Sequence, residues 1–312
     1  DPAEIINKYG ADILRLWAAS ADYHADVRCS DAIFKQLSQN YLKFRNTARY
    51  CLGNLDGFDP NNLVAPADML ELDRWAVTRL NALIEKCAQA YNDYEFLVVT
   101  HAVNDFCVVE LSNFYLDIIK DRLYCDETDG LARRSAQTAL YLILDTITKI
   151  MAPILCFTGD EIWLAMPHKA GDDDRNVLFN DMNGVFADYA LSADEMAKWE
   201  KIIEVRDAVN GALETARADK TIGKSLEAEV DLAVTPEDGF LASMDAAQVA
   251  DLFIVSQVRV DVDAEQKVAV RPANGAKCAR CWKVLPTVGS DAEHPELCPR
   301  CAAVVKNLPV IE

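Results

Sequence analysis

The chain has 312 residues, of which 51% are hydrophobic and 26% charged, and it carries a net charge of −19 at pH 7. This composition indicates a soluble globular protein long enough for two or three domains, and the acidity opposes, at first sight, nucleic-acid binding. The most apolar stretch, residues 139–157, is interrupted by charged residues and a proline. It predicts a buried helix and excludes a membrane span, so no membrane partner is expected.

The first residues predict a helix start, because Asp1 is a good N-cap and Pro2 suits the first turn. The chain begins with this helix start and has no initiator methionine. We therefore expect it to be a piece of a longer protein.

Residues 1–167 are predicted to be almost entirely helical. Ser30 is expected to cap a helix that ends at Leu52, where apolar residues recur at intervals of three and four. Further helices are predicted at 70–92, 97–124 and 130–151. The segment from Thr158 to Glu161 has the pattern of a capping box that opens a short helix carrying Trp163. Long amphipathic helices joined by short connections predict a helix bundle over residues 1–167.

The pattern changes after this bundle. Residues 168–192 are more polar and are expected to form a linker or surface loop, and a helix is predicted at 193–218. Residues 226–234 then alternate between apolar and polar side chains, which is typical of a strand. A helix at 236–250 and strands at 252–262 and 267–271 complete a small α+β domain, which together with the preceding helix covers 193–272.

Four cysteines near the C-terminus form a C-x2-C-x16-C-x2-C array within a predicted zinc finger at residues 273–308 (Cys278, Cys281, Cys298 and Cys301). Two such pairs can close a tetrahedral sulfur cage around one structural zinc ion, with no position left open for chemistry. The alternatives are two disulfides or chance clustering. The other six cysteines are scattered singly, which suits a reducing cytoplasm. The expected fold class is mainly α, with a helix bundle followed by a small α+β domain and a four-cysteine zinc finger.

The acidic charge is unevenly distributed. Residues 271–306 contain six Lys or Arg against three acidic residues, which is +3 locally and −22 for the remainder. A small basic module on an acidic body can still hold a polyanion locally.

Several segments of this sequence resemble known ones. Residues 1–17 (DPAEIINKYGADILRLW) are similar to the segment after the KMSKS loop of class I aminoacyl-tRNA synthetases, to which the resemblance assigns residues 1–30. The stretches KFRNTAR (43–49), ELSNFY (110–115) and FTGDEIW (157–163) resemble the anticodon-binding bundle of the isoleucine/valine/leucine group. ARADKTIGKSLEA (216–228), with CARCW (278–282) and CPRC (298–301), resembles specifically the bacterial-type isoleucyl-tRNA synthetases.

The resemblance implies a tRNA-binding region of a cytoplasmic, monomeric isoleucine–tRNA ligase that uses ATP. It also implies one structural zinc ion per chain and the isoleucine tRNA as partner. None of the four histidines stands in the family's H-x-G-H motif, and no KMSKS-like run is present. We therefore expect the catalytic and editing domains, and the ATP site, to lie in the rest of the same polypeptide. This chain alone is expected to be inactive.

On the helix after Ser30, Arg45 and Arg49 stand one turn apart beside the apolar stripe, and Lys35 lies on the same outer half. Two guanidinium groups at this spacing can bridge successive phosphates or lie flat against a base. The alternative is an ordinary solvated helix face. The family's use of this bundle favours tRNA contact.

The zinc finger offers three further candidates for RNA contact. Trp282 could stack on an unpaired base, or it could cover the zinc knuckle and pack internally. Arg280 and Arg300 lie inside the two cysteine pairs. They could reach phosphates, neutralise the negative charge of a zinc–thiolate cage, or do both.

Two other functions remain possible at this stage. The same cysteine spacing resembles the finger of DNA glycosylases, but those enzymes use an N-terminal proline, and here Asp1 precedes Pro2. The other is a zinc-ribbon interaction module without a nucleic-acid role, which the acidic body favours.

Overall fold

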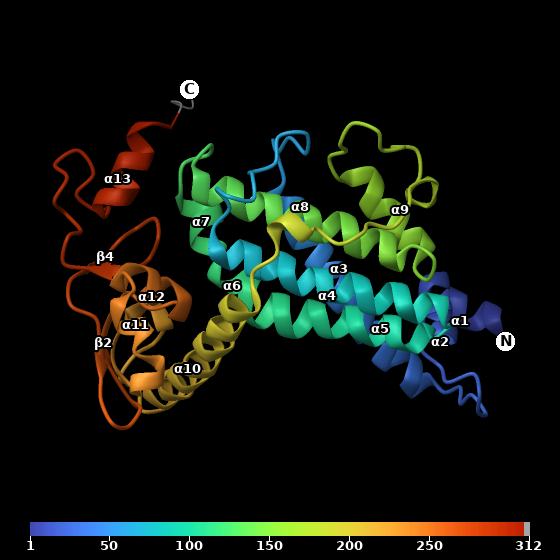
Figure 1. The fold of residues 1–312 in the computed structure, drawn as a ribbon, viewed down its shortest axis with the longest axis horizontal. Helices are drawn as coiled ribbons and strands as arrows, with labels where there is room; N and C mark the ends of the chain where they lie inside the picture. The colour runs from blue at the N-terminus through green and yellow to red at the C-terminus, as the bar shows by residue number, and fades with distance from the viewer. Residues whose placement is uncertain (309–312) are drawn as a thin grey trace. The chain divides into compact units, whose positions relative to one another are not determined.

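The computed structural model describes residues 1–308, and the chain divides into two compact units. The first unit comprises residues 1–119 and 129–191, and the second comprises residues 120–128 and the chain from Ser192 onward. Helices dominate both units, and the sheets lie in the second (Figure 1). The predicted fold class is confirmed, whereas the predicted domain limits stay a prediction.

The first unit is a bundle of long helices. In chain order its elements are α1 (Pro2–Tyr9), α2 (Ala11–Ala19), α3 (Asp31–Asn54), α4 (Glu71–Asn92), α5 (Phe96–Asp105), η1 (Phe106–Tyr115), α6 (Leu116–Ile118), α8 (Leu131–Met151), α9 (Cys156–Ala165), η2 (Val177–Phe179) and η3 (Ala187–Tyr189). Helix α4 lies beside α5 and α8, and α3 also packs against α8 (Figure 1). Helix α8 is the centre of the core, because every residue from Ser135 to Met151 is buried. Among the described residues, no helix is both long and apolar enough to cross a membrane.

Helix α3 begins as its sequence predicts. The Ser30 hydroxyl accepts a hydrogen bond from the backbone N–H of Ile33, which satisfies one of the unpaired donors of the first turn. One stripe of the helix is buried in the bundle (Phe34, Leu37, Phe44, Thr47, Ala48 and Cys51). The opposite side therefore remains available to solvent.

The helix predicted at 97–124 is interrupted. Residues Phe106–Tyr115 form a π-helical stretch, η1, and a separate helix, α7 (Lys120–Cys125), belongs to the second unit. Within η1 the buried side chains recur at intervals of four to five residues, as at Phe106, Leu111 and Tyr115. This interval fits the wider turn of i→i+5 hydrogen bonding and keeps the apolar side on the core.

The capping box predicted at Thr158 is wrong, because helix α9 already begins at Cys156. The Asp12 carboxylate, from α2, accepts hydrogen bonds from the Thr158 backbone N–H at 2.8 Å and from its hydroxyl at 2.6 Å. A carboxylate from a distant helix thus caps α9 and complements the positive end of its dipole.

Residues 168–191 belong to the first unit, and Val177 and Leu191 are buried there. The Tyr189 hydroxyl donates to the Val64 carbonyl at 2.9 Å, and the Arg74 guanidinium donates to the Ala190 carbonyl at 2.7 Å. These hydrogen bonds tie the segment to the bundle as a surface loop.

The second unit combines helices with a three-stranded sheet. Its elements are α7, α10 (Ala193–Ala218), η4 (Ser225–Glu227), β1 (Ala228–Val234), η5 (Pro236–Asp238), α11 (Phe240–Ser243), α12 (Ala246–Phe253), β2 (Gln257–Val262), β3 (Lys267–Pro272), β4 (Ala276–Lys277), β5 (Val284–Leu285) and α13 (Pro299–Lys306). The strand order is β2-β1-β3. Val230 of the central strand faces Val258 in a parallel pair and Val270 in an antiparallel pair. Helix α10 packs on β3, and α12 packs on β2.

Two sequence predictions in this unit need correction. The helix predicted at 236–250 is broken into η5, α11 and α12, because Asp245 caps a new helix through the Ala247 backbone N–H at 2.7 Å. The strand predicted from Leu252 begins only at Gln257, because α12 continues to Phe253. Ile254 then adopts a left-handed conformation with φ of 56°, which ends the helix.

Candidate metal centre and nucleic-acid interface

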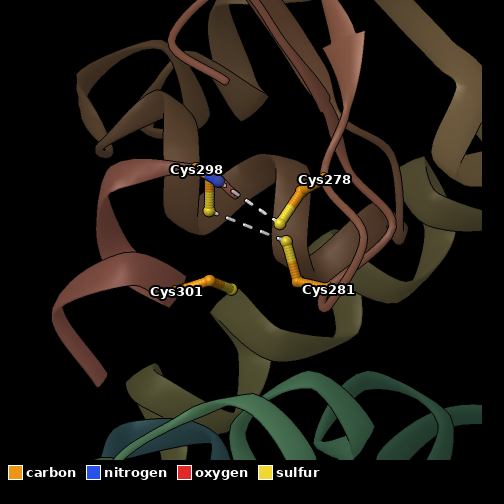
Figure 2. A group of neighbouring side chains, drawn as sticks. All are labelled: Cys278, Cys281, Cys298 and Cys301. Carbon is orange, nitrogen blue, oxygen red and sulfur yellow. Dashed lines mark hydrogen bonds between the residues drawn. The ribbon is translucent and has the colours of Figure 1, made fainter. Parts of the chain in front are cut away.

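Four cysteine sulfurs converge in the second unit. Cys278 and Cys281 lie on the turn between β4 and β5, Cys298 is the N-cap of α13, and Cys301 lies in its first turn. All four side chains are buried, and their Sγ atoms lie within 4.8 Å of one another. The Sγ atoms of Cys281 and Cys298 are 3.8 Å apart (Figure 2). The two sequence-distant pairs therefore form one compact sulfur cluster.

The dimensions of this cluster fit zinc. A tetrahedral site with Zn–S bonds of ~2.3 Å places its sulfurs about 3.8 Å apart. Four soft thiolate donors are the usual set for a structural zinc ion, and they leave no place for a reacting water. The chain thus has a structural zinc site, and Cys278, Cys281, Cys298 and Cys301 would hold the metal.

The backbone around Cys278 favours the thiolate form of this ligand. Burial by itself raises the pKa of the Cys278 thiol, but hydrogen bonds from the N–H groups of Cys281, Cys298 and Arg280 lower it to about 6. The Cys298 N–H donates to the Cys278 Sγ at 3.3 Å (Figure 2). The N-terminal end of α13 adds a positive partial charge beside two of the sulfurs. Burial raises the pKa of the Cys281 thiol to about 11 and also raises the pKa values of Cys298 and Cys301. Among the four ligands, the backbone thus stabilises the charged form, which zinc requires, at Cys278.

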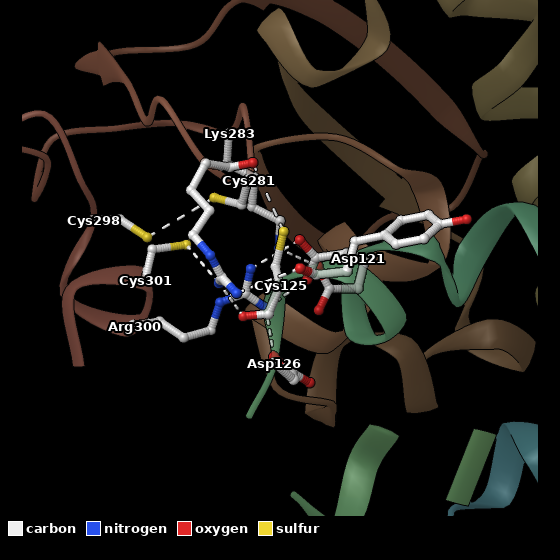
Figure 3. Close-up of polar contacts among 11 residues, drawn as sticks. Asp121, Cys125, Asp126, Cys281, Lys283, Cys298, Arg300 and Cys301 are labelled. Carbon is white, nitrogen blue, oxygen red and sulfur yellow. Dashed lines mark hydrogen bonds and ion pairs between the residues drawn. The ribbon is translucent and has the colours of Figure 1, made fainter. Parts of the chain in front are cut away.

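Arg300 (Figure 3) and Arg280 both have protein partners within the second unit. The Arg300 guanidinium makes a bidentate contact with Asp121, with one N–O distance of 2.8 Å, and lies 3.2 Å from Asp126. Burial by itself raises the pKa of Asp121, but Arg300 lowers it below the ordinary value. Arg280 donates to the Cys125 carbonyl, where α7 ends, and approaches the Cys301 Sγ at 3.9 Å.

These contacts favour the structural role that the sequence left open for Arg280 and Arg300. Their guanidinium groups fix the finger to residues 120–128 and offset part of the negative charge of the sulfur cage. A direct contact of either guanidinium group with RNA stays a prediction.

Trp282 follows the last residue of the first cysteine pair and is 57% exposed. Its backbone has a φ of 65°, in the left-handed region that suits glycine far better than an aromatic residue. Its backbone N–H donates to the Cys278 carbonyl at 3.0 Å, which closes the knuckle. Lys224 Nζ lies 5.9 Å from the centroid of the indole ring. The zinc knuckle thus holds a large, exposed aromatic surface in a fixed place.

The three cationic candidates on α3 are all exposed. Lys35 forms an ion pair with Asp31 at 3.0 Å. Within the described part of the chain, Arg45 and Arg49 form no ion pair and no side-chain hydrogen bond. Both lie beside the buried stripe of the helix. These two guanidinium groups keep their full hydrogen-bonding capacity for an external anion.

Sequence reasoning missed Lys220 and Lys224 as candidates. Both are exposed on the loop between α10 and η4, and Lys224 lies over Trp282. In the sequence, Lys220 and Lys224 stand close together, on either side of Gly223, just before the predicted strand at 226–234. This pattern alone does not indicate a binding site, because only the fold brings Lys224 close to Trp282 at the zinc knuckle.

Comparison with protein families gives two matches. Residues 73–232 match the anticodon-binding domain of tRNA ligases, and residues 275–304 match the zinc finger found in FPG and IleRS. The first match covers α4 through most of β1 and just over half of the chain. The second contains all four cysteines of the sulfur cluster.

Curated relatives are isoleucine–tRNA ligases. That of Syntrophotalea carbinolica is 48% identical over 98% of this chain and 34% of the relative. Those of Geobacter sulfurreducens and Geobacillus kaustophilus are each 46% identical over the same shares. The chain thus spans about one third of the length of these relatives.

A solved structure of a LeuRS–tRNA–LeuAMS ternary complex from Agrobacterium radiobacter K84 aligns with a TM-score of 0.46 and 13% identity. The alignment covers 88% of this chain and 25% of the other chain, and a similarity this low supports no conclusion. The family matches and the identity to the relatives support a family assignment, because together they extend over the bundle and the zinc finger. The chain belongs to the tRNA-ligase family defined by this anticodon-binding domain, and it is similar to the C-terminal part of isoleucine–tRNA ligases.

Proposed function

We propose that this chain binds the anticodon arm of isoleucine tRNA as the C-terminal region of an isoleucine–tRNA ligase. The observation that carries the proposal is the combination, in one chain, of the anticodon-binding domain and the FPG/IleRS-type finger. The parent enzyme would join isoleucine to its tRNA using ATP, with the catalytic and editing domains elsewhere on the same polypeptide. We further propose that the parent is a cytoplasmic monomer.

Two surfaces would contact the RNA. Arg45 and Arg49, with Lys35 beside them, would bind phosphates of the anticodon stem, because they offer cationic donors one helical turn apart. Trp282 would stack on an unpaired base of the anticodon loop, since its ring is exposed and fixed by the knuckle. Zinc would act indirectly by holding the knuckle, and no bond would be made or broken in this chain.

The first test measures binding to three nucleic acids at two salt concentrations. These are isoleucine tRNA, the same tRNA with an altered anticodon, and a DNA duplex that carries a damaged base. We expect the unaltered tRNA to bind best. The Arg45→Gln and Arg49→Gln variants should bind more weakly, and each should lower the slope of log K against log salt by about 0.7–0.9.

Arg175→Gln is the matched control, because Arg175 is exposed on the same unit but forms an ion pair with Asp173 at 2.6 Å. It should leave both affinity and salt slope unchanged. Tighter binding to the lesion duplex would instead support a glycosylase-like DNA-binding protein. Equal binding to all three nucleic acids would contradict anticodon recognition.

A second test isolates the stacking role of Trp282. The Trp282→Gly substitution removes the ring and suits the backbone φ of 65°, so the folded state should lose no stability from the backbone. Loss of one stacked base costs about 1–3 kcal/mol, which is a roughly 5- to 150-fold weaker affinity for the anticodon arm. Binding is measured by fluorescence anisotropy with labelled RNA, and stability by thermal melting.

The Trp282→Phe variant should recover part of the affinity, because a smaller ring still stacks. If Trp282→Gly bound RNA like the unaltered chain, the stacking role would be wrong. If it melted at a much lower temperature, Trp282 would be a packing residue.

A further inference from the structure

The loop of residues 219–224, between α10 and η4, has a fixed conformation. Ile222 is buried with 5% exposure, and the Thr221 N–H donates to the Ala216 carbonyl at 2.9 Å. Lys220 has a φ of 60°, so the chain reverses direction there in the left-handed conformation. The loop is anchored from within and presents its remaining side chains to solvent.

Glu227 and Arg217 hold this loop from its two sides. The Glu227 carboxylate accepts hydrogen bonds from the backbone N–H groups of Gly223 at 3.0 Å and Lys224 at 3.2 Å. A Cβ at Gly223 would lie 3.0 Å from the same carboxylate, so a larger residue there would disturb the contact. The Arg217 guanidinium donates to the Ser225 hydroxyl at 2.7 Å. The backbone donors of the turn are thus already used, and only side chains can bind a ligand.

Lys220 and Lys224 are the exposed cationic side chains of this loop that could bind a ligand. Among the described residues neither has a carboxylate partner, whereas Lys201, Lys267 and Lys283 of the same unit each form an ion pair. Lys220 lines an open cavity of about 380 Å³ together with Arg217, Thr221, Ile222, Gly223, Glu227 and Pro272.

The loop meets the zinc knuckle at Trp282. Lys224 Nζ lies 5.9 Å from the ring centroid, within the range in which a cation is attracted to an indole face. Both residues belong to the second unit, and each is held by its own anchor, the Glu227 carboxylate for the loop and the cysteine cage for the knuckle. A flat aromatic ring and the Lys224 ammonium group therefore lie next to each other on a preformed surface, and Lys220 is exposed on the same loop, four residues earlier in the chain.

We propose that Lys220, Lys224 and Trp282 form one binding site for an unpaired RNA nucleotide, whose base stacks on Trp282 while its neighbouring phosphates bind the two lysines. A loop nucleotide supplies both groups at once, whereas duplex nucleic acid keeps its bases stacked inside. This inference rests on the proposed function and deepens it, because it assigns phosphate contacts to a loop outside the bundle and the finger.

The test uses a hairpin RNA with the sequence of the isoleucine anticodon arm, the same hairpin with an altered loop, and adenosine monophosphate. The Lys220→Gln/Lys224→Gln variant should bind the first hairpin about tenfold more weakly, with the salt slope reduced by about 1.4–1.8 for two lost phosphate contacts. Lys267→Gln is the control, since Lys267 is exposed in the same unit but pairs with Asp263 at 3.2 Å. Zinc content and melting temperature should be unchanged in all variants.

A double-mutant cycle tests whether the lysines and Trp282 hold the same nucleotide. Combining Lys224→Gln with Trp282→Gly should weaken binding by less than the product of the two separate effects, because both residues contact one nucleotide. Independent effects would overturn the shared site. An unchanged affinity and salt slope in the lysine variant would overturn the phosphate contacts.

Failure of this inference can be told apart from failure of the proposed function. If the unaltered chain prefers the isoleucine hairpin but the lysine variant behaves like the control, only the inference fails. If the lysine variant weakens both hairpins equally and no preference exists, the phosphate site stands and anticodon recognition fails. Binding of adenosine monophosphate as tight as that of the hairpin would replace the RNA site with a free-nucleotide site.

Discussion

Removal of zinc is expected to unfold residues 275–305 and to leave most of the helical signal intact. The buried cluster of this module is small, and four of its members are the cysteines of the cage, accompanied by Cys125, Leu297 and Ala302. Without the metal, so few apolar side chains cannot offset the entropy of ordering the two knuckles. Structural zinc supplies about 10–16 kcal/mol of apparent binding free energy in zinc-finger peptides, so its loss outweighs any other single change here. Amide hydrogen exchange with and without a chelator measures the effect residue by residue.

The first unit has its own core around α8 and should keep its protection from exchange. Cys301→Ala removes a ligand and should abolish stoichiometric zinc binding. Cys125→Ala is the matched control, because Cys125 is buried in the same cluster but is not one of the four converging sulfurs. It should retain one zinc ion per chain by native mass spectrometry. Equal zinc loss in both variants, or a collapse of helicity on chelation, would contradict this division of the chain.

The sequence predicted those features that depend on neighbours in the chain. Ser30 caps α3, the helix predicted at 193–218 is α10, and the alternation of 228–234 forms the central strand of the sheet. The four cysteines could be grouped because their spacing is itself the geometry of two knuckles. In each case the physical cause lies within a few residues, where backbone hydrogen bonds and side-chain periodicity decide the structure.

Features that depend on distant residues could not be predicted in this way. The N-terminus of α9 is capped by Asp12, more than a hundred residues away, and a local capping-box pattern therefore misled. Arg280 and Arg300 were ambiguous for the same reason, since their partners at 121–126 are brought to them only by the fold. Exposed cations such as Arg45 cannot be told from paired ones by sequence, because a carboxylate partner can come from any part of the chain.

Replacing Lys149 with methionine is expected to cost the first unit about 3–5 kcal/mol, because it leaves a carboxylate buried without its cation. The side chains of Lys149 and Asp145 are 4% and 1% exposed, and their nearest N–O distance is 2.9 Å. The Asn183 amide donates to the other Asp145 oxygen at 2.6 Å, and Lys149 Nζ lies 5.1 Å from the Trp163 ring centroid. Methionine fills most of the volume, so the loss reports charge and hydrogen bonding more than packing. Urea unfolding followed by hydrogen exchange of the α8 amides measures it.

Lys35→Met is the matched control, because Lys35 and Asp31 have the same i,i+4 spacing on α3 but lie in solvent, with Lys35 69% exposed. Solvent screens that pair, so its removal should leave the stability of the unit almost unchanged. Replacing both buried partners, as in Asp145→Leu/Lys149→Met, should be less destabilising than Lys149→Met alone, since no uncompensated charge remains in the core. If the double variant were the less stable of the two, the buried pair would be contributing net stability, and the cost of Lys149→Met would come from a lost attraction. The comparison therefore separates the desolvation of Asp145 from its attraction to Lys149.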